Sequence, residues 1–353
     1  MRLFVILLSL QLCLGCVYAQ GDARALEAKM LRPLPVPISN NAVASVIAGG
    51  RVFVVSFNGL AKGRRYSDTV STTYVLDVAA DQWSEAAPVP GDVGRLASAA
   101  VSVGELAYVF GGYSVTEDGT EISTPWTHSF DPLTQVFGEL QSMPVPVDDA
   151  VAVTYADRYI YLISGWHDLG NVNLVQRYDT HTDSWDQATP IPGSALFGHA
   201  GGIVDNKIVY CDGVAIRSHA DHARDYVASN ECFLGIIDKE DNRRIDWRHI
   251  DAHPGLPRYR MAAAGMPQEN AVLFIGGTDN PYNYNGVGYD GEPSEPSSGG
   301  LRFDLDSLEW QALSQSNAPT MDHRALVILD DRMLTVGGMS GGQNVTDKVI
   351  AYE

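Results

Sequence analysis

The stretch "PRYRMAAAGMPQENAVLFIGG", residues 257–277, decides the fold, because shortened copies of it recur along the chain. It places Arg258 and Arg260 before a run of small residues, which a turn separates from an apolar run ending in two glycines. Short apolar runs bounded by turn residues are typical of buried β-strands. The stretch therefore predicts two antiparallel strands, with two arginines at the head of the first.

The apolar run with its closing glycine occurs six times in all, and similar features follow five of the copies. The other copies are VFVVSFNG (52–59), YVFGG (108–112), YLISG (161–165), VYCDG (209–213) and LTVGG (334–338). In five of the six, a loop and a strand follow, the strand ends in a large apolar residue and an acid, and an aromatic residue comes shortly after. These sets are Leu76-Asp77 with Trp83, Phe130-Asp131 with Phe137, Tyr178-Asp179 with Trp185, Ile237-Asp238 with Trp247, and Phe303-Asp304 with Trp310. Each unit reads as four short strands, which cannot bury both faces alone and must pack radially as blades.

This repeat resembles the kelch family, whose mark is a double glycine followed by a spaced aromatic residue and Trp. The resemblance covers nearly the whole chain after its first residues and implies an all-β, six-bladed kelch β-propeller with four-stranded antiparallel blades. We expect a single domain over residues 20–353, with blades near 38–90, 91–146, 147–192, 193–255, 256–319 and 320–353. The last unit lacks its fourth strand, and residues 24–37 carry the matching proline run. An N-terminal strand should therefore complete the last blade and close the ring, which removes exposed sheet edges.

The first residues predict export. Residues 1–19 combine Arg2, a short apolar run and the sequence Val-Tyr-Ala, so we expect a signal peptide that is cleaved near Ala19. A lipoprotein anchored at Cys16 is the alternative. Cleavage would leave a net charge of −20, which disfavours nucleic acid and anionic membranes as partners. No later apolar run is long enough for a transmembrane segment, and we expect a monomer.

Two cysteines remain after the signal, and in an exported protein Cys211 and Cys232 are expected to form a disulfide. Two free buried thiols are the alternative. The loop between them holds His219 and His222, which could bind a metal but are more often solvated, so we predict no metal site. Asn344 begins a glycosylation sequon, which matters only in a host that glycosylates.

Aligning the segments that begin each blade suggests a ring of polar residues around the axis. In a propeller the first strand of each blade is innermost, and one polar residue precedes each run of small residues. The six are Asn41, Arg95, Asp149, His199, Arg260 and Arg324. We expect these side chains to point into a central pocket. Within the kelch family, arginines at this position also hold neighbouring blades together through backbone carbonyls, which is the structural alternative.

The loops after the second strands should surround the same pocket, because binding residues concentrate in loops on a rigid scaffold. Tyr113, Trp166, Asp279 and Tyr282 lie in these loops and are predicted to bind substrate. The segment 279–300 is rich in Tyr, Asn, Pro and Gly, and its polar aromatic residues suit stacking on a sugar. A disordered insert is the other interpretation of that segment.

Within the kelch family, the chain resembles the exported N-acetylneuraminate epimerase (sialic acid mutarotase) group in its signal sequence, blade count, N-terminal closure and size. No motif matches the catalytic Glu and Arg of that group, so the resemblance implies architecture and site location. It suggests that a small anionic ligand, an acidic sugar, is bound by two of Arg95, Arg260 and Arg324. His199 and Asp149 are the predicted acid and base, with Glu231 in reserve, and no cofactor is required.

Two other functions are compatible with the pattern. A propeller with the same residues could bind a glycan or an acidic peptide without turnover, and fold alone does not separate the two. A copper radical oxidase needs a Cys cross-linked to a Tyr, and it is disfavoured because both remaining cysteines are expected to pair with each other.

Overall fold

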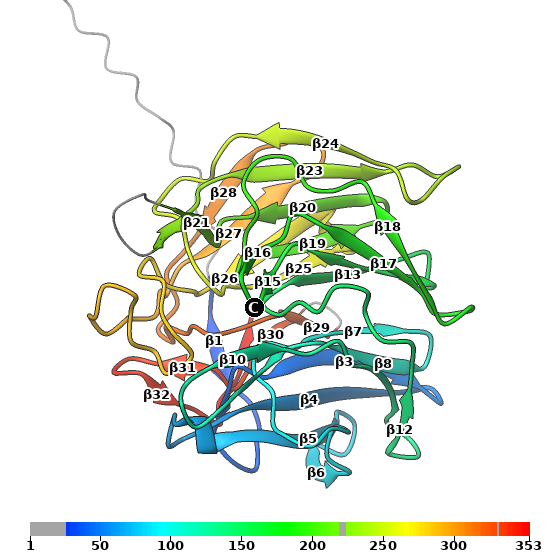
Figure 1. The fold of residues 1–353 in the computed structure, drawn as a ribbon, viewed down its shortest axis with the longest axis vertical. Coiled ribbons are helices and arrows are strands. Elements are labelled where there is room, and N and C mark those ends of the chain that lie inside the picture. The colour runs from blue at the N-terminus through cyan, green and yellow to red at the C-terminus, as the bar shows by residue number, and fades with distance from the viewer. Residues whose placement is uncertain (1–25, 219–223, 330–331) are drawn as a thin grey trace, which may run out of the picture.

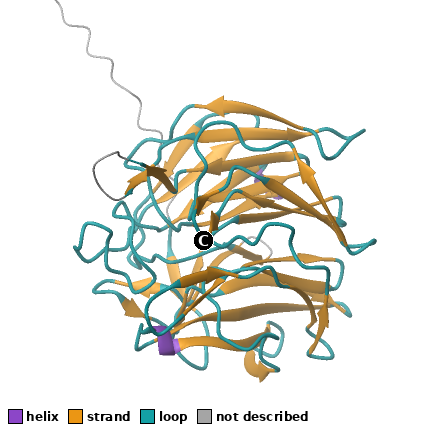
Figure 2. Ribbon diagram, viewed as in Figure 1, coloured by secondary structure: helices purple, strands orange, loops and turns teal. Residues whose placement is uncertain are grey.

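The computed structural model describes residues 26–218, 224–329 and 332–353. Its described residues form six antiparallel blades of four strands around a central axis, as predicted, with a short fifth strand in the first sheet and short hairpins in the loops (Figure 1). Strands and loops make up nearly all of the structure, and the helical segments are the single turns η1 (Tyr66–Asp68) and η2 (Pro267–Glu269) (Figure 2). The protein is therefore a six-bladed β-propeller.

Each of the six sheets runs from an innermost strand, beside the axis, to an outermost strand at the rim. In that order the first three are β3 (Ala42–Ala48), β4 (Arg51–Ala61), β5 (Thr69–Asp77) and β6 (Gln82–Ala86); β7 (Ala99–Val103), β8 (Leu106–Phe110), β11 (Thr127–Asp131) and β12 (Val136–Glu139); and β13 (Val151–Tyr155), β14 (Tyr159–Ile163), β17 (Val175–Asp179) and β18 (Ser184–Ala188). The last three are β19 (Ala200–Val204), β20 (Lys207–Cys211), β23 (Cys232–Ile237) and β24 (Ile245–Ile250); β25 (Ala262–Met266), β26 (Ala271–Ile275), β27 (Gly300–Asp304) and β28 (Trp310–Leu313); and β29 (Val327–Leu329), β30 (Arg332–Val336), β33 (Val349–Tyr352) and β1 (Ala28–Met30).

The loops after the second strands carry extra pairs of short strands. These are β9 (Tyr113–Val115) with β10 (Glu121–Ser123), β15 (Trp166–His167) with β16 (Gly170–Asn171), β21 (Val214–Arg217) with β22 (Asp225–Ala228), and β31 (Met339–Ser340) with β32 (Asn344–Val345). In the first blade, β2 (Ile38–Ser39) pairs directly with β4. These hairpins follow the glycine turns, so they lie at one end of the central axis and surround it there.

The ring closes through the N-terminal strand, as predicted. Strand β1 pairs antiparallel with β33, and Ala28 faces Tyr352 (Figure 1, blue beside red). The following residues continue the contact, because the Leu34 N–H donates to the carbonyl of Asp347 at 2.8 Å. Leu34 is 2% exposed and packs into the core between the last blade and the first. The first and last segments of the propeller therefore share one sheet.

The glycines at the ends of the second strands explain the repeated motif. In each blade the second glycine, or its equivalent, donates its N–H to a carbonyl in the segment that enters the next blade. The six bonds run from Gly59 to Arg95, Gly112 to Val147, Gly165 to Leu196, Gly213 to Arg258, Gly277 to Thr320 and Gly338 to Ile38, at 2.8–3.3 Å. At Gly112 the φ angle is +82°, and a Cβ would lie 2.6 Å from the carbonyl oxygen of Leu96. Any side chain there would be strained and would also collide with backbone.

The repeated tryptophans have an equivalent role at the outer edge. Four indole Nε1–H groups donate to backbone carbonyls of the preceding blade, which ties the outer strands together. These bonds run from Trp83 to Arg32, Trp185 to Gln141, Trp247 to Thr189 and Trp310 to Asp251, at 2.7–3.2 Å. In the second blade Phe137 takes this place and packs on Phe130 and Phe57. At five of the six junctions, neighbouring blades are therefore attached to each other at both their inner and outer ends.

The predicted disulfide joins Cys211 and Cys232, which face each other on β20 and β23 with their Cα atoms 4.2 Å apart. Both cysteines are fully buried, and they lie at the base of the β21–β22 hairpin. In the described part of the chain, no helix is both long and apolar enough to cross a membrane. The predicted signal peptide, Cys16, His219 and His222 lie outside the described residues.

The closure of the ring predicts a position-dependent loss of stability. Leu34→Ala should lower the free energy of unfolding by about 2–4 kcal/mol, because it leaves a cavity between the last and first blades. Met30→Ala, in the same segment but at a side chain that is 52% exposed, should have little effect. Thermal denaturation of both variants is the measurement. Equal melting temperatures would contradict a structural role for the N-terminal segment.

The disulfide predicts a second loss. Replacing both Cys211 and Cys232 by Ala should lower the free energy of unfolding by about 3 kcal/mol, the value expected when a loop of this length is no longer closed. Urea denaturation of the double variant against the oxidised protein gives the difference. Unchanged stability, or two alkylatable thiols in the untreated protein, would refute the prediction.

Candidate functional site

A ring of backbone hydrogen bonds surrounds the axis where the chain enters the inner strands. One residue in each blade has a positive φ and lies at the same place in this ring; the six are Asn40, Ala97, Asp149, Gly198, Arg260 and Asp322. Five consecutive bonds pass from blade to blade: Ala97 N–H to Asn40, Asp149 to Ala97, Gly198 to Asp149, Arg260 to Gly198, and His323 to Arg260. The sixth is made by a side chain, because the Asn40 N–H donates to Asp322 Oδ2 at 2.9 Å.

This geometry changes the alignment expected from the sequence. Of the six residues predicted to share one ring, Asp149 and Arg260 occupy it, whereas Asn41 and His199 lie one residue after the equivalent position. Arg95 lies two residues before it and Arg324 two residues after it. The alignment failed because it counted the last polar residue before the small run, while the structure repeats a backbone conformation that Ala97 and Gly198 also adopt.

At the centre of the ring, four buried charged side chains form one cluster, which we call the axial ion cluster: Asp149, Arg260, Asp322 and Arg324. Arg260 Nη2 donates to Asp149 Oδ2 at 2.6 Å, and its Nη1 donates to Asp322 Oδ1 at 3.2 Å. Arg324 Nε lies 2.7 Å from Asp149 Oδ1, and Nη1 lies 3.4 Å from Asp322 Oδ1. Each arginine therefore bridges both carboxylates, and the cluster is formally neutral.

Aromatic rings and one amide complete the axial ion cluster. The Arg260 guanidinium lies over the rings of Tyr259 and Tyr282, 4.6 and 5.1 Å from their centroids. The Tyr282 hydroxyl donates to Asp322 at 3.1 Å, and Arg324 donates to Asn40 Oδ1 at 2.6 Å. Burial alone would raise the pKa of Asp149, but the charges of Arg260 and Arg324 outweigh it and hold that pKa below its usual range. Asp149 is therefore ionised at neutral pH.

The two arginines of the opening stretch have separate roles. Arg258 donates to the carbonyls of Gly276 and Gly299, which fixes the glycine turn of its own blade. Arg95 is its equivalent in the second blade: it donates to Gly111 and lies over the Trp126 ring, and burial lowers its pKa to about 10. Arg260 holds the axial ion cluster instead. None of these three side chains projects freely into an open central pocket.

Two other ring candidates are also held within the propeller wall. The Asn41 amide donates to Ser56 Oγ and to the carbonyl of Val336, which joins the first and last blades. His199 is buried against the edge of the Tyr210 ring, and burial lowers its pKa to about 4. His199 is thus neutral at physiological pH. Neither Asn41 nor His199 lines either of the two cavities described next.

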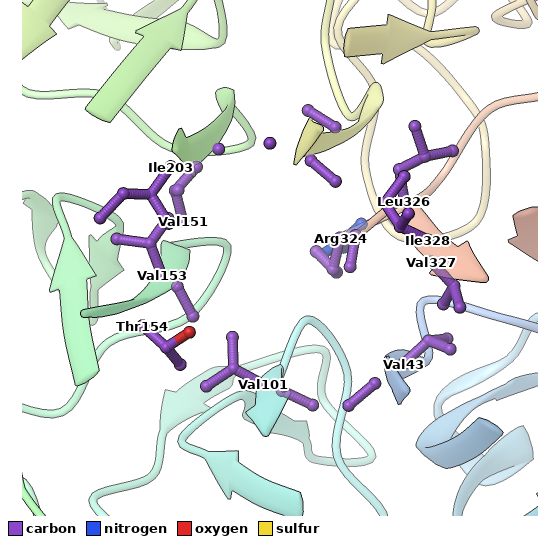
Figure 3. Close-up of a pocket in the computed structure, with 18 of the residues that line it drawn as sticks. Val43, Val101, Val151, Val153, Thr154, Ile203, Arg324, Leu326, Val327 and Ile328 are labelled. Carbon is purple, nitrogen blue, oxygen red and sulfur yellow. The ribbon is translucent and has the colours of Figure 1, made fainter. Parts of the chain in front are cut away.

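A cavity of about 230 Å³ lies along the axis between the inner strands (Figure 3). Its wall consists of Val, Ala, Gly, Ser, Thr, Ile and Leu residues of the six inner strands and the segments beside them, and Arg324 is the one charged residue among the described residues that line it. Figure 3 shows Arg324 reaching into this space from the segment that leads into β29. Because Arg324 is paired with both carboxylates, this cavity offers little chemistry.

A second cavity, of about 310 Å³, lies on the loop side of the axial ion cluster; we call it the loop-side cavity. Its wall combines aromatic rings, carboxyl groups and one arginine. The aromatic residues are Tyr113, Trp166, Phe197, Tyr226, Tyr284 and Tyr289, and the charged residues are Glu121, Asp148, Asp149, Asp168 and Arg260. The Tyr226 and Tyr289 rings stack with their centroids 4.0 Å apart. Polar groups that converge in an aromatic cavity are typical of a small-molecule site.

Two carboxyl groups of the loop-side cavity have strongly raised pKa values. Burial raises the pKa of Asp148 well above its usual range, and the neighbouring charge of Asp149 adds to this. Burial also raises the pKa of Glu121 to about 7, with Arg260 opposing the shift. Asp148 and Asp149 are adjacent in sequence, but their pKa values are shifted in opposite directions, because only Asp149 is paired with arginine. Such divergence between neighbouring carboxyl groups is characteristic of acid–base sites.

The β9–β10 hairpin brings Glu121 to Asp148. Ser123 Oγ donates to Asp148 Oδ2 at 2.8 Å, and the Ser123 N–H donates to Asp168 Oδ1 at 2.8 Å. Residues two apart in a strand share a face and are about 7 Å apart, so Glu121 lies on the same face of β10 as Ser123. Both the Glu121 and the Asp148 side chains line the loop-side cavity, and the charge of Glu121 adds to the rise in the pKa of Asp148.

The remaining predicted residues divide among different places. Tyr113 and Trp166 line the loop-side cavity, and Tyr282 lies beneath it in the axial ion cluster. Asp279 lines a separate groove with Arg258 and Glu295. Glu231 accepts the Ser194 N–H and lines a third cavity beside β21 and β22. The structure thus brings Asp149 together with Tyr113 and Trp166 in the wall of the loop-side cavity, whereas neither His199 nor Glu231 lines that cavity.

Sequence analysis missed Glu121, Asp148, Asp168 and Tyr226. The signal at 148–149 was present, because two aspartates stand together directly before the small residues of an inner strand. Glu121 lies in an insertion, and no sequence pattern indicated that this insertion folds back over the axis.

Among the described residues, no group of three or more His, Cys, Asp or Glu side chains is arranged to hold a metal ion. The described cysteines are joined to each other, so neither is free for the Cys–Tyr cross-link of a copper radical oxidase.

Comparisons with known proteins agree with the fold. No known family profile matches the chain. Kelch-like protein 15 of Danio rerio is 20% identical over 251 residues, which are 71% of this chain and 40% of that protein. Kelch-like protein terF of Aspergillus terreus is 26% identical over 227 residues, 60% of this chain and 44% of that protein. The chain thus spans about two fifths of the length of these curated relatives.

A solved structure, titled "Structure of YjhT", superimposes with a TM-score of 0.72 at 15% identity and covers 92% of this chain and 100% of that one. At this identity the match bears on the fold alone. Together with the six sheets and the glycine and tryptophan repeats, these similarities show that the fold is a six-bladed kelch β-propeller.

The axial ion cluster predicts that Arg260 is needed for stability. Arg260→Gln should lower the free energy of unfolding by about 3–5 kcal/mol, because it leaves two buried carboxylates with less compensation. Arg248→Gln is the control, since Arg248 pairs with Asp246 at the surface and both side chains are more than 60% exposed. That change should cost under about 1 kcal/mol. Similar denaturation midpoints for the two variants would refute the role of Arg260.

Proposed function

We propose that this protein is a cofactor-independent sugar mutarotase or epimerase, which binds one sugar ring in the loop-side cavity. The proposal rests on one observation: Glu121 and Asp148, two carboxyl groups of raised pKa, line the same aromatic-walled cavity. The resemblance to the exported mutarotase group of the kelch family supports the same reaction class. Because propellers of one fold serve many functions, the assignment depends on the residues of the cavity.

The chemistry requires two proton transfers. Opening a cyclic hemiacetal removes the proton of the anomeric hydroxyl and protonates the ring oxygen, while the bond between the anomeric carbon and the ring oxygen breaks. The open-chain carbonyl then recloses on its other face, and the protons return. A carboxyl group whose pKa is near 7 exchanges protons most effectively at neutral pH, so Glu121 is the base in this proposal. Asp148, which stays protonated, is the acid.

The other residues of the cavity position the sugar. Trp166 and the stacked pair Tyr226 and Tyr289 provide flat apolar surfaces for its C–H faces. Asp149, held in place by Arg260 and Arg324, can accept hydrogen bonds from sugar hydroxyls. The side chains that line the cavity thus provide the proton transfers and the binding surfaces that anomeric exchange needs. Export, which the sequence predicts and with which the disulfide is compatible, remains part of the proposal.

Anomeric exchange tests the proposal. Glu121→Gln should reduce kcat by about 10²–10⁴-fold, the usual contribution of a positioned base, as measured by NMR exchange between the α and β anomers of a monosaccharide panel. Glu117→Gln makes the same charge change at an exposed position of the same hairpin and should leave the rate unchanged. Because the base must be ionised, the wild-type rate should rise as pH increases through about 7, and Glu121→Gln should lose this rise. Binding without any exchange would instead identify a non-catalytic glycan-binding propeller.

A further inference from the structure

The charge of the loop-side cavity indicates which sugars it accepts. The sequence suggests an acidic sugar because it places three arginines near the axis. In the structure Arg95 lies in the propeller wall, and Arg324 faces the axial cavity. Arg260 is the one basic residue among the described residues that line the loop-side cavity. An anionic substrate would therefore depend on Arg260 alone.

Arg260 has little capacity left for an anion. Both Nη groups donate to aspartates, the Tyr259 and Tyr282 rings cover the guanidinium, and the side chain is 2% exposed. Only its buried Nε has no hydrogen-bond partner among the described residues. A sugar carboxylate in this position would gain one contact with Arg260 and would lie among carboxyl groups that repel it.

Three carboxyl groups of the cavity form no ion pair with an arginine or lysine of its described wall: Glu121, Asp148 and Asp168. Asp168 accepts a hydrogen bond from the Ser123 N–H, which aligns its carboxylate but does not compensate its charge. Asp148 accepts a hydrogen bond from Ser123 Oγ, and its raised pKa keeps it protonated. The rings of Trp166, Tyr226, Tyr284 and Tyr289 line the same cavity. Carboxyl groups combined with aromatic faces are the surroundings that attract an ammonium group.

We propose that the substrate of the loop-side cavity is a sugar with a free, protonated amino group, not an acidic sugar. This inference rests on the proposed function for the sugar ring and adds the class of substituent. The ammonium group would lie beside Asp168 and the ionised form of Glu121, with the protonated Asp148 as a neutral neighbour, and would supply the positive charge that these carboxylates lack. Because the axial ion cluster is formally neutral, it would have little effect on whether a cationic or an anionic sugar binds.

The test compares matched sugars that differ in one substituent. Saturation-transfer NMR titrations would use glucosamine, galactosamine and mannosamine, each beside its neutral parent hexose and the corresponding uronic acid, at pH 7.5. We expect at least one amino sugar to bind about ten-fold more tightly than its parent hexose, and its uronic acid to bind more weakly still. A uronic acid that binds more tightly than the amino sugar, or the absence of binding by all three amino sugars, would overturn the inference.

Variants locate the preference and separate it from catalysis. Asp168→Asn should lower the preference for the amino sugar over its parent hexose several-fold, and Glu117→Gln should leave it unchanged. An unchanged preference in Asp168→Asn would overturn the placement of the ammonium group. Anomeric exchange is recorded on the same samples: an amino sugar that binds without faster exchange would refute the proposed reaction and leave the inference standing. If a neutral or acidic sugar is instead the best substrate, the inference about the amino group is refuted and the proposed reaction stands.

Discussion

The propeller depends on a ring of hydrogen bonds around the axis, in which each blade is linked to the next. At each junction a residue of positive φ accepts or donates through its backbone, and a glycine turn donates to the same entering segment. Five backbone bonds complete most of the inner ring, and the sixth place is taken by the Asp322 carboxylate, which accepts the Asn40 N–H. Because this last bond needs a side chain, a charge is buried at the axis. The axial ion cluster follows from that requirement.

A buried carboxylate must be paired, since an isolated charge in the interior is very costly. Asp322 is accompanied by Arg260 and Arg324, and these two arginines in turn hold Asp149 ionised. Asp148, one residue away, has no such partner and keeps its proton. The different protonation of two adjacent aspartates, on which the proposed chemistry depends, is thus a consequence of how the ring is closed. Fold and site are connected through this cluster.

Much of the fold could be predicted from the sequence, because its determinants are local and repeated. The glycine turns require residues that tolerate positive φ, the tryptophans recur at a similar distance after an acid, and the missing last strand points to the N-terminal segment. The disulfide also followed from two cysteines on expected neighbouring strands. The site was less accessible to sequence, because the polar residues that precede the inner strands differ by one or two positions among blades. Side-chain identity at His199 or Arg95 gave no indication of that offset.

The loop hairpins explain why the remaining residues of the site could not be predicted from the sequence. Glu121 and Tyr226 reach the axis only because β9–β10 and β21–β22 fold over it, and the lengths of these insertions follow no repeat. A chain with net charge −19 also makes local charge difficult to infer, since any arginine near the axis suggests an anion site. Such an inference holds only when the arginine is unpaired. In this propeller Arg260 and Arg324 pair with Asp149, which precedes Arg260 by 111 residues, so the groups that remain to face a ligand are carboxyl groups and aromatic rings.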